Sequence, residues 1–132
     1  MQQGNKHYHM DQWDEALSYY HEAIELLESI DSIDSGNAQK TLQAWVCGYH
    51  NLASTYEKQG FIERRRDALV TPFRIMLALT NNSQSTLEMQ MFTYRALQMT
   101  IPPLLEFANT YPSEVKFIKQ LIGSIESNKQ LH

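Results

Sequence analysis

The stretch LQAWVCGYHNLASTYEKQG, residues 42–60, decides the fold class of this chain. Its large apolar side chains recur at intervals of three, four, three and four residues, at Leu42, Trp45, Tyr49, Leu52 and Tyr56. This period matches a helical turn, so one face of a helix carries them all. Gly60 favours the end of that helix, because glycine takes a positive φ without strain. We therefore predict a helix from about residue 37 to residue 59.

The same helical period recurs on both sides of this stretch, and no run alternates with the period of two that a sheet requires. Further helices are predicted at about residues 2–10, 13–30, 61–79, 86–101, 103–108 and 113–126, seven in all. Turn-forming residues at 31–37 and 81–83 separate them. Ser85 with Glu88 indicates a capping box before the fifth helix. Pro72 is expected to kink or split the fourth helix.

Short connections between amphipathic helices favour antiparallel neighbours, so we predict an all-α single domain of stacked hairpins over residues 1–132. The hairpins are expected at about 2–30, 37–80 and 85–111, with a capping helix at about 113–128. The inward-facing residues are predicted as Ile62, Leu69, Phe73 and Met76 in the fourth helix, and Leu87, Met91, Tyr94, Leu97 and Ile101 in the fifth.

Composition excludes several classes of protein. The 132 residues are 42% hydrophobic and 20% charged, with a net charge of −4, which is typical of an ordinary globular domain. The basic cluster Arg64–Arg66 is expected to be a solvated start of the fourth helix, so neither nucleic acid nor a membrane is an expected partner. A single cysteine, Cys47, and an N-terminus without an apolar signal run favour the cytoplasm.

Small and aromatic residues alternate as they do in tetratricopeptide (TPR) repeats. The matching residues are Gly4, Ala16, Tyr20 and Ala23 in the first hairpin, and Tyr49, Leu52, Ala53, Tyr56 and Gly60 in the second. The chain therefore resembles a TPR protein over about residues 3–27 and 49–79, although 49 residues separate Gly4 from Ala53, instead of about 34. It is also similar to a small uncharacterised family of bacterial proteins. The TPR resemblance implies a short right-handed superhelix with a concave face.

The resemblance also implies that this concave groove binds a protein or peptide without catalysis. The groove residues are predicted to be Asn5, His9, His50, Asn51, Ser54, Glu57, Lys58, Phe92 and Arg95. Two asparagines at the places of Asn5 and Asn51 help to hold a peptide carboxylate in chaperone-binding TPR domains. The cations that such a clamp needs are missing at the matching positions, so we expect both to be polar groove residues.

Two other functions compete with peptide binding. One is a homodimer in which the fifth and seventh helices bury one another. The other is a small-ligand or enzymatic pocket around His50, Asn51 and Glu57. No cofactor, metal or catalytic set is expected, because the histidine spacings do not suit a metal site and Cys47 with His50 lacks an orienting group.

Overall fold

The computed structural model describes residues 35–82 and 86–130, and within these ranges every regular element is helical. The elements are α3 (Ser35–Gln59), α4 (Ile62–Thr80), α5 (Leu87–Met99), α6 (Ile101–Thr110), the short 3-10 helix η1 (Pro112–Glu114) and α7 (Val115–Gln130). The predicted all-α class is confirmed. The helices predicted at about 2–10 and 13–30, and with them the first hairpin, lie outside the described residues.

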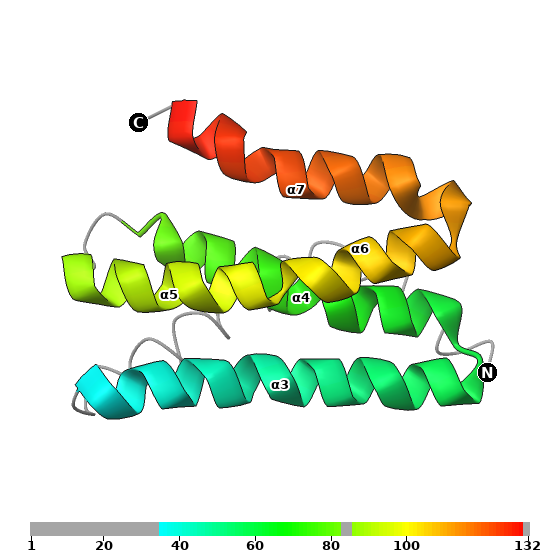
Figure 1. Ribbon diagram of the computed structural model, residues 1–132, viewed down its shortest axis with the longest axis horizontal. Helices are drawn as coiled ribbons and strands as arrows, with labels where there is room; N and C mark the ends of the chain where they lie inside the picture. The colour runs from blue at the N-terminus through cyan, green and yellow to red at the C-terminus, as the bar shows by residue number, and fades with distance from the viewer. Residues whose placement is uncertain (1–34, 83–85, 131–132) are drawn as a thin grey trace, which may run out of the picture.

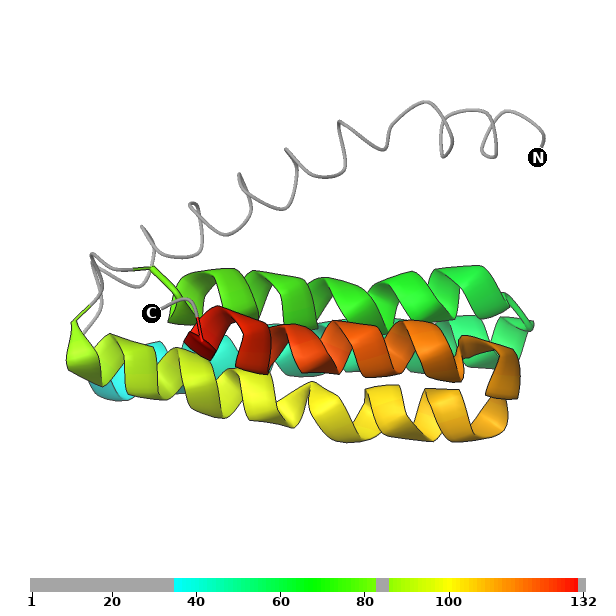
Figure 2. The ribbon, with the colours of Figure 1, turned by 90° about the horizontal axis from the view of Figure 1, so that it is seen from above.

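The helices lie in three layers (Figure 1), with α3 on one side, α4 beside α5 and α6 in the middle, and α7 on the other side. α3 and α4 are antiparallel neighbours, and α5 packs against both of them. Seen from above, α7 lies along the line between α4 and the α5–α6 rod (Figure 2), and it packs mainly on α6. This arrangement leaves one long side of α3 without a neighbour among the described helices.

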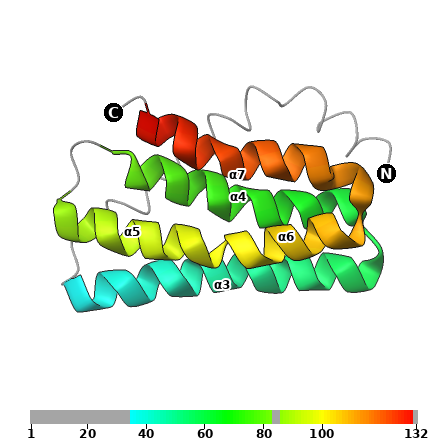
Figure 3. The ribbon, with the colours of Figure 1, turned by 45° about the horizontal axis from the view of Figure 1, so that its top comes forward.

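The prediction of a third hairpin over about residues 85–111 is wrong. α5 and α6 lie end to end along nearly one line (Figure 3) instead of side by side. Thr100, which joins them, has helical dihedral angles (φ −80°, ψ −15°), so the chain continues in the same direction. Pro102 and Pro103 lack the N–H groups that would continue the helical bonds, and they interrupt the helix without reversing it. The described residues thus form four helical rods, because α5 and α6 share one line, and the first two of the seven predicted helices lie outside these residues.

Two helix boundaries can be compared with the predictions made from the local sequence. Gly60 has φ +77°, and the amides of Gly60 and Phe61 bond back to the carbonyls of Glu57 and Tyr56, as in a Schellman helix end. At the start of α5 the cap is Thr86, whose hydroxyl accepts a bond of 3.1 Å from the Met89 amide. The cap is therefore one residue after the predicted Ser85, and the predicted capping box does not form there, because Met89 cannot accept a hydrogen bond from the Thr86 amide as a glutamate would. Ser35–Asn37, predicted as part of a turn, already belong to α3.

The core of α3 is rotated from the predicted aromatic face. Leu42 is fully buried, but Leu52 is 41% exposed and the rings of Trp45, Tyr49 and Tyr56 are only partly buried. The centre of the buried face is occupied by Ala38, Leu42, Val46 and Ala53. Two helices, α4 and α5, pack on α3, and small side chains allow their close approach, so the large rings lie at the edge of the contact.

The middle helices follow the predicted faces only in part. In α4, Leu69, Phe73 and Met76 are buried as predicted, whereas Ile62, in its first turn, is 44% exposed. α4 continues through the buried Pro72, so the helix is not split there. In α5, Leu97 is buried, but Leu87 and Met91 are 76% and 48% exposed, so their predicted burial is wrong. The smaller Thr93 and Ala96 take the buried positions, because α5 lies close to both α3 and α4.

Candidate functional site

A partly enclosed cavity of about 240 Å³ lies where α3, α4 and α6 meet, and we call it the α3–α6 pocket. The lining residues come from α3, from α4 and from the first turns of α6. Its lining residues are His50, Ala53, Ser54, Glu57, Arg65, Leu69, Pro103 and Glu106. Five of these eight carry polar or charged side chains, although the pocket lies directly beside the buried core.

Arg65 ties the three walls of this pocket together. Its side chain is only 10% exposed, and a guanidinium nitrogen lies 3.6 Å from the Glu57 carboxylate on α3. The guanidinium carbon also lies 5.4 Å from the centre of the Phe107 ring on α6, which is within the range of a cation–π contact. A nearly buried cation thus has one anionic and one aromatic partner, each from a different helix.

His50 is the second unusual group in the lining. The side chain is half-buried, its Nε2 atom is inaccessible to solvent, and this nitrogen has no hydrogen-bond partner among the described residues. Burial lowers the pKa of His50 below its usual value of 6.5, because the charged imidazolium loses its hydration. At neutral pH His50 is therefore a neutral ring, which can donate or accept one hydrogen bond at that buried nitrogen.

The predicted groove residues divide into two groups. His50, Ser54 and Glu57 come together in the α3–α6 pocket. Four others do not line it: Asn51 and Lys58 are exposed elsewhere on α3, Arg95 is exposed on α5, and Phe92 is partly buried against the core. Asn5 and His9 lie outside the described residues. The pocket imagined around His50, Asn51 and Glu57 therefore contains the first and third of these residues but not the second.

Sequence reasoning missed the contributions of α4 and α6. Arg65 was expected to be solvated, yet it is 8% exposed. A usable signal existed, because Arg65 lies four residues before Leu69 and eight before Phe73, on the inward face of the same helix. Pro103 and Glu106 carried no such signal. They reach the pocket only because α6 continues in line with α5 and passes alongside α3 and α4.

The three consecutive arginines have three different environments, each over a phenylalanine ring. Arg64 is exposed and lies 5.0 Å from the Phe61 ring centre, as a solvated helix start predicts. Arg66 lies 5.8 Å from the Phe117 ring on α7, and its guanidinium donates a bond of 3.2 Å to Glu114. Together with Arg65, these contacts connect the first turns of α4 to α3, α6 and α7.

The lining of the pocket suits binding through hydrogen bonds and charge. Two carboxylates, one guanidinium, one hydroxyl and one neutral imidazole line it. Cys47 is exposed and is not part of the lining. Over the described ranges, no group of three or more His, Cys, Asp or Glu residues is arranged to hold a metal ion. None of the helices in those ranges is both long and apolar enough to cross a membrane.

Comparisons with known proteins place the chain in a family. Searches of the curated proteins and of the solved structures found no match to this chain. A family described as "Protein of unknown function (DUF2753)" matches residues 1–131, which is nearly the whole sequence. The chain, with its helical rods and the pocket between α3, α4 and α6, belongs to this family.

Proposed function

We propose that the protein is a non-catalytic interaction module, which holds a peptide or helix of a partner protein against the α3–α6 pocket. The observation that supports this proposal is a polar, half-open pocket whose lining combines the nearly buried Arg65 with the exposed Glu106. The exposed polar groups of this lining can exchange their hydrogen bonds to water for hydrogen bonds to a bound partner.

The size and charge of the pocket define the partner's chemistry. A volume of about 240 Å³ is below the range of typical cofactor pockets and fits one large side chain. Arg65 is already paired with Glu57, whereas Glu106 is exposed at the rim and adds one negative charge. A side chain that donates hydrogen bonds, and above all a lysine or arginine, therefore matches the lining.

Selection of peptides on the immobilised protein tests this proposal. A displayed peptide library is enriched on the wild-type chain, and the affinity of the selected peptides is measured by calorimetry. We expect a recurring lysine or arginine at one position of the peptides. The substitution Glu106→Gln should weaken binding about tenfold or more, as the loss of one charged hydrogen bond does. His50→Ala should also weaken binding, because the pocket lining loses its ring.

Lys58→Ala is the matched control, because Lys58 is an exposed residue of the same helix outside the pocket lining. Its affinity for the selected peptides should equal that of the wild type. Peptides that bind all three variants equally well, or that carry no basic residue, would contradict the proposal.

The TPR-like architecture is part of this proposal. Support comes from the antiparallel α3–α4 pair, with Ala53 buried between the helices and Gly60 in the turn. In this interpretation α3 and α4 form one repeat of a right-handed superhelix, α7 caps its end, and the module works in the cytoplasm.

A homodimer is the second candidate function, and exposed apolar side chains favour it. On α5, Leu87 and Met91 are 76% and 48% exposed and lie four residues apart on one helical face. On α7, Phe117 is 37% exposed. Light scattering after size-exclusion chromatography measures the mass directly, and Met91→Glu should convert a dimer through this face into a monomer. A monomeric wild-type protein would exclude it.

A further inference from the structure

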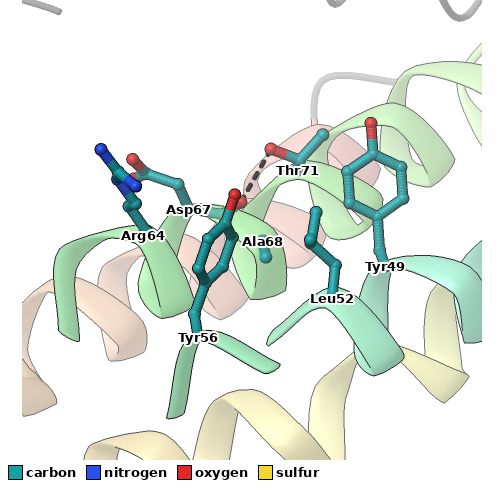
Figure 4. A pocket seen from close by; sticks show the side chains of 7 residues that line it. All are labelled: Tyr49, Leu52, Tyr56, Arg64, Asp67, Ala68 and Thr71. Carbon is teal, nitrogen blue, oxygen red and sulfur yellow. Dashed lines mark hydrogen bonds between the residues drawn. The ribbon is translucent and has the colours of Figure 1, made fainter. Parts of the chain in front are cut away.

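A second surface lies on the α3–α4 pair, outside the α3–α6 pocket. It is an open hollow of about 240 Å³, and we call it the aromatic surface. Its lining residues are Tyr49, Leu52 and Tyr56 from α3, and Arg64, Asp67, Ala68 and Thr71 from α4. Figure 4 shows the two tyrosines and Leu52 along α3, with the four α4 side chains beyond them.

This surface exposes apolar side chains. Leu52 and Phe61 are each 41% exposed, and their rings and methyl groups continue a row of aromatic side chains along α3. The Trp45 and Tyr49 rings lie 4.8 Å apart, and the Tyr56 and Phe61 rings 6.5 Å apart. An exposed apolar row of this length is typical of a face that another element covers.

The charged side chains of the surface lie on its α4 side. Arg64 is exposed in the first turns of α4 and lies over the Phe61 ring, close to the end of α3. The carboxylate of Asp67, which also lines the hollow, lies 3.8 Å from Arg66, and Arg66 is shared with Glu114. The surface is thus apolar along α3 and charged on its α4 side, where Arg64 is an exposed cation.

From these features we infer that the aromatic surface is the docking site of residues 11–34 of the same chain. This segment directly precedes α3 and lies outside the described residues. Its sequence predicts an amphipathic helix whose apolar stripe is Ala16, Tyr20, Ala23, Leu27 and Ile30. It contains eight acidic residues and neither lysine nor arginine: Asp11, Asp14, Glu15, Glu22, Glu25, Glu28, Asp31 and Asp34.

The place at which the segment joins α3 determines its direction. A segment that ends at residue 34 and lies along α3 runs antiparallel to it, so its acidic beginning meets the end of α3, where Arg64 lies. Ile30 and Ala16 are 14 residues apart, and so are Ala38 and Leu52. Both intervals span about 21 Å of helix, so a register that places Ile30 beside the first turn of α3 places Ala16 beside Leu52. A small alanine then faces a large, half-exposed leucine.

The covalent connection favours this occupant over a separate molecule. A tethered segment meets its site at an effective concentration on the order of millimolar, which a second copy of the chain or another protein rarely reaches. The acidic segment also offers carboxylates to Arg64, the exposed cation of the surface. This docking does not depend on the α3–α6 pocket or on the function proposed for it.

Disulfide trapping in the full chain tests the docking. Cys47 is the only cysteine of the protein, so Cys47→Ser provides a background without thiols. Into this background we introduce Ala16→Cys with Leu52→Cys, and as a matched control Ala16→Cys with Ser54→Cys. Ser54 is two residues from Leu52 but lines the α3–α6 pocket on another face of α3. Under mild oxidation the first pair should form an intramolecular disulfide at least tenfold faster than the control.

Each other outcome overturns the inference. Equal rates for the two pairs, or no disulfide in either, would show that residue 16 does not face residue 52. A disulfide that links two chains would assign the surface to a second copy instead.

Proteolysis of chains without new cysteines provides an independent measurement. A glutamate-specific protease should cleave the segment after Glu15, Glu22, Glu25 or Glu28 at least fivefold faster in Arg64→Glu than in the wild type. Arg74→Glu is the control, because Arg74 is exposed on α4 outside the aromatic surface. Equal cleavage rates in wild type and Arg64→Glu would overturn the electrostatic contact and with it the proposed direction of docking.

Discussion

Replacement of Arg65 by alanine should destabilise the fold more than any other single change of an ionisable residue in α4. Arg65 is the nearly buried cation that contacts Glu57 on α3 and the Phe107 ring on α6. The substitution removes both contacts together with the aliphatic part of the side chain, which is covered by the neighbouring helices. It leaves Glu57 in place, and this carboxylate is 57% exposed, so water can replace its partner.

The magnitude follows from these contacts. A cation–π contact of a desolvated arginine contributes about 1–2 kcal/mol. The ion pair contributes only about 0.5 kcal/mol, because one partner is mostly in water. Loss of the buried side-chain stem adds about 1 kcal/mol. We therefore expect the free energy of unfolding to fall by about 3 kcal/mol, a large part of the stability of a domain of this size.

Equilibrium unfolding in urea, followed by circular dichroism, measures this change. Arg74→Ala is the matched control on the exposed side of the same helix, and we expect it to alter stability by less than about 0.5 kcal/mol. Arg65→Lys retains the charge without the planar face and should lose about 1–2 kcal/mol. If Arg65→Ala were no more destabilising than Arg74→Ala, the side chain would not connect the three helices, and our reasoning about it would fail.

Two further predictions concern a turn and a titrating group. Gly60→Ala should lower the free energy of unfolding by about 1 kcal/mol, because φ +77° strains any residue with a Cβ. Gly123→Ala, on the exposed side of α7, should raise the free energy of unfolding by about 0.5–1 kcal/mol. Thermal unfolding of both variants measures the difference, and equal effects of the two substitutions would contradict this prediction. Because burial lowers the pKa of His50, the unfolded chain binds its proton first as the pH falls below 6.5, so stability should decrease from pH 6.5 down through the lowered pKa. Urea unfolding at pH 7 and pH 5 should show a smaller loss in His50→Gln than in the wild type, and an identical loss in both would refute the role of His50.

The helices and one helix end could be predicted from the sequence alone. The three-four period of the apolar residues predicted helices at the positions of α3, α4, α5, α6 and α7, because helical periodicity depends only on neighbours within two turns. Gly60 as a helix end was also predictable, since its positive φ is a property of the residue itself. On α3, three of the predicted groove residues, His50, Ser54 and Glu57, line one pocket, whereas their role in binding a partner stays a prediction.

What the tertiary structure decided was which helices meet, and therefore which faces are buried. The stripe of large rings on α3 lies at an edge because two helices converge on Ala38, Leu42, Val46 and Ala53, and no period within α3 records that convergence. α5 and α6 lie in one line because Thr100 keeps a helical backbone, although two prolines follow it closely. Arg65 meets a ring 42 residues later in the chain. Helix formation depends on local sequence, whereas burial and helix pairing depend on contacts between distant segments. The pocket is formed by the packing of three helices and therefore could not be predicted from the sequence of any one of them.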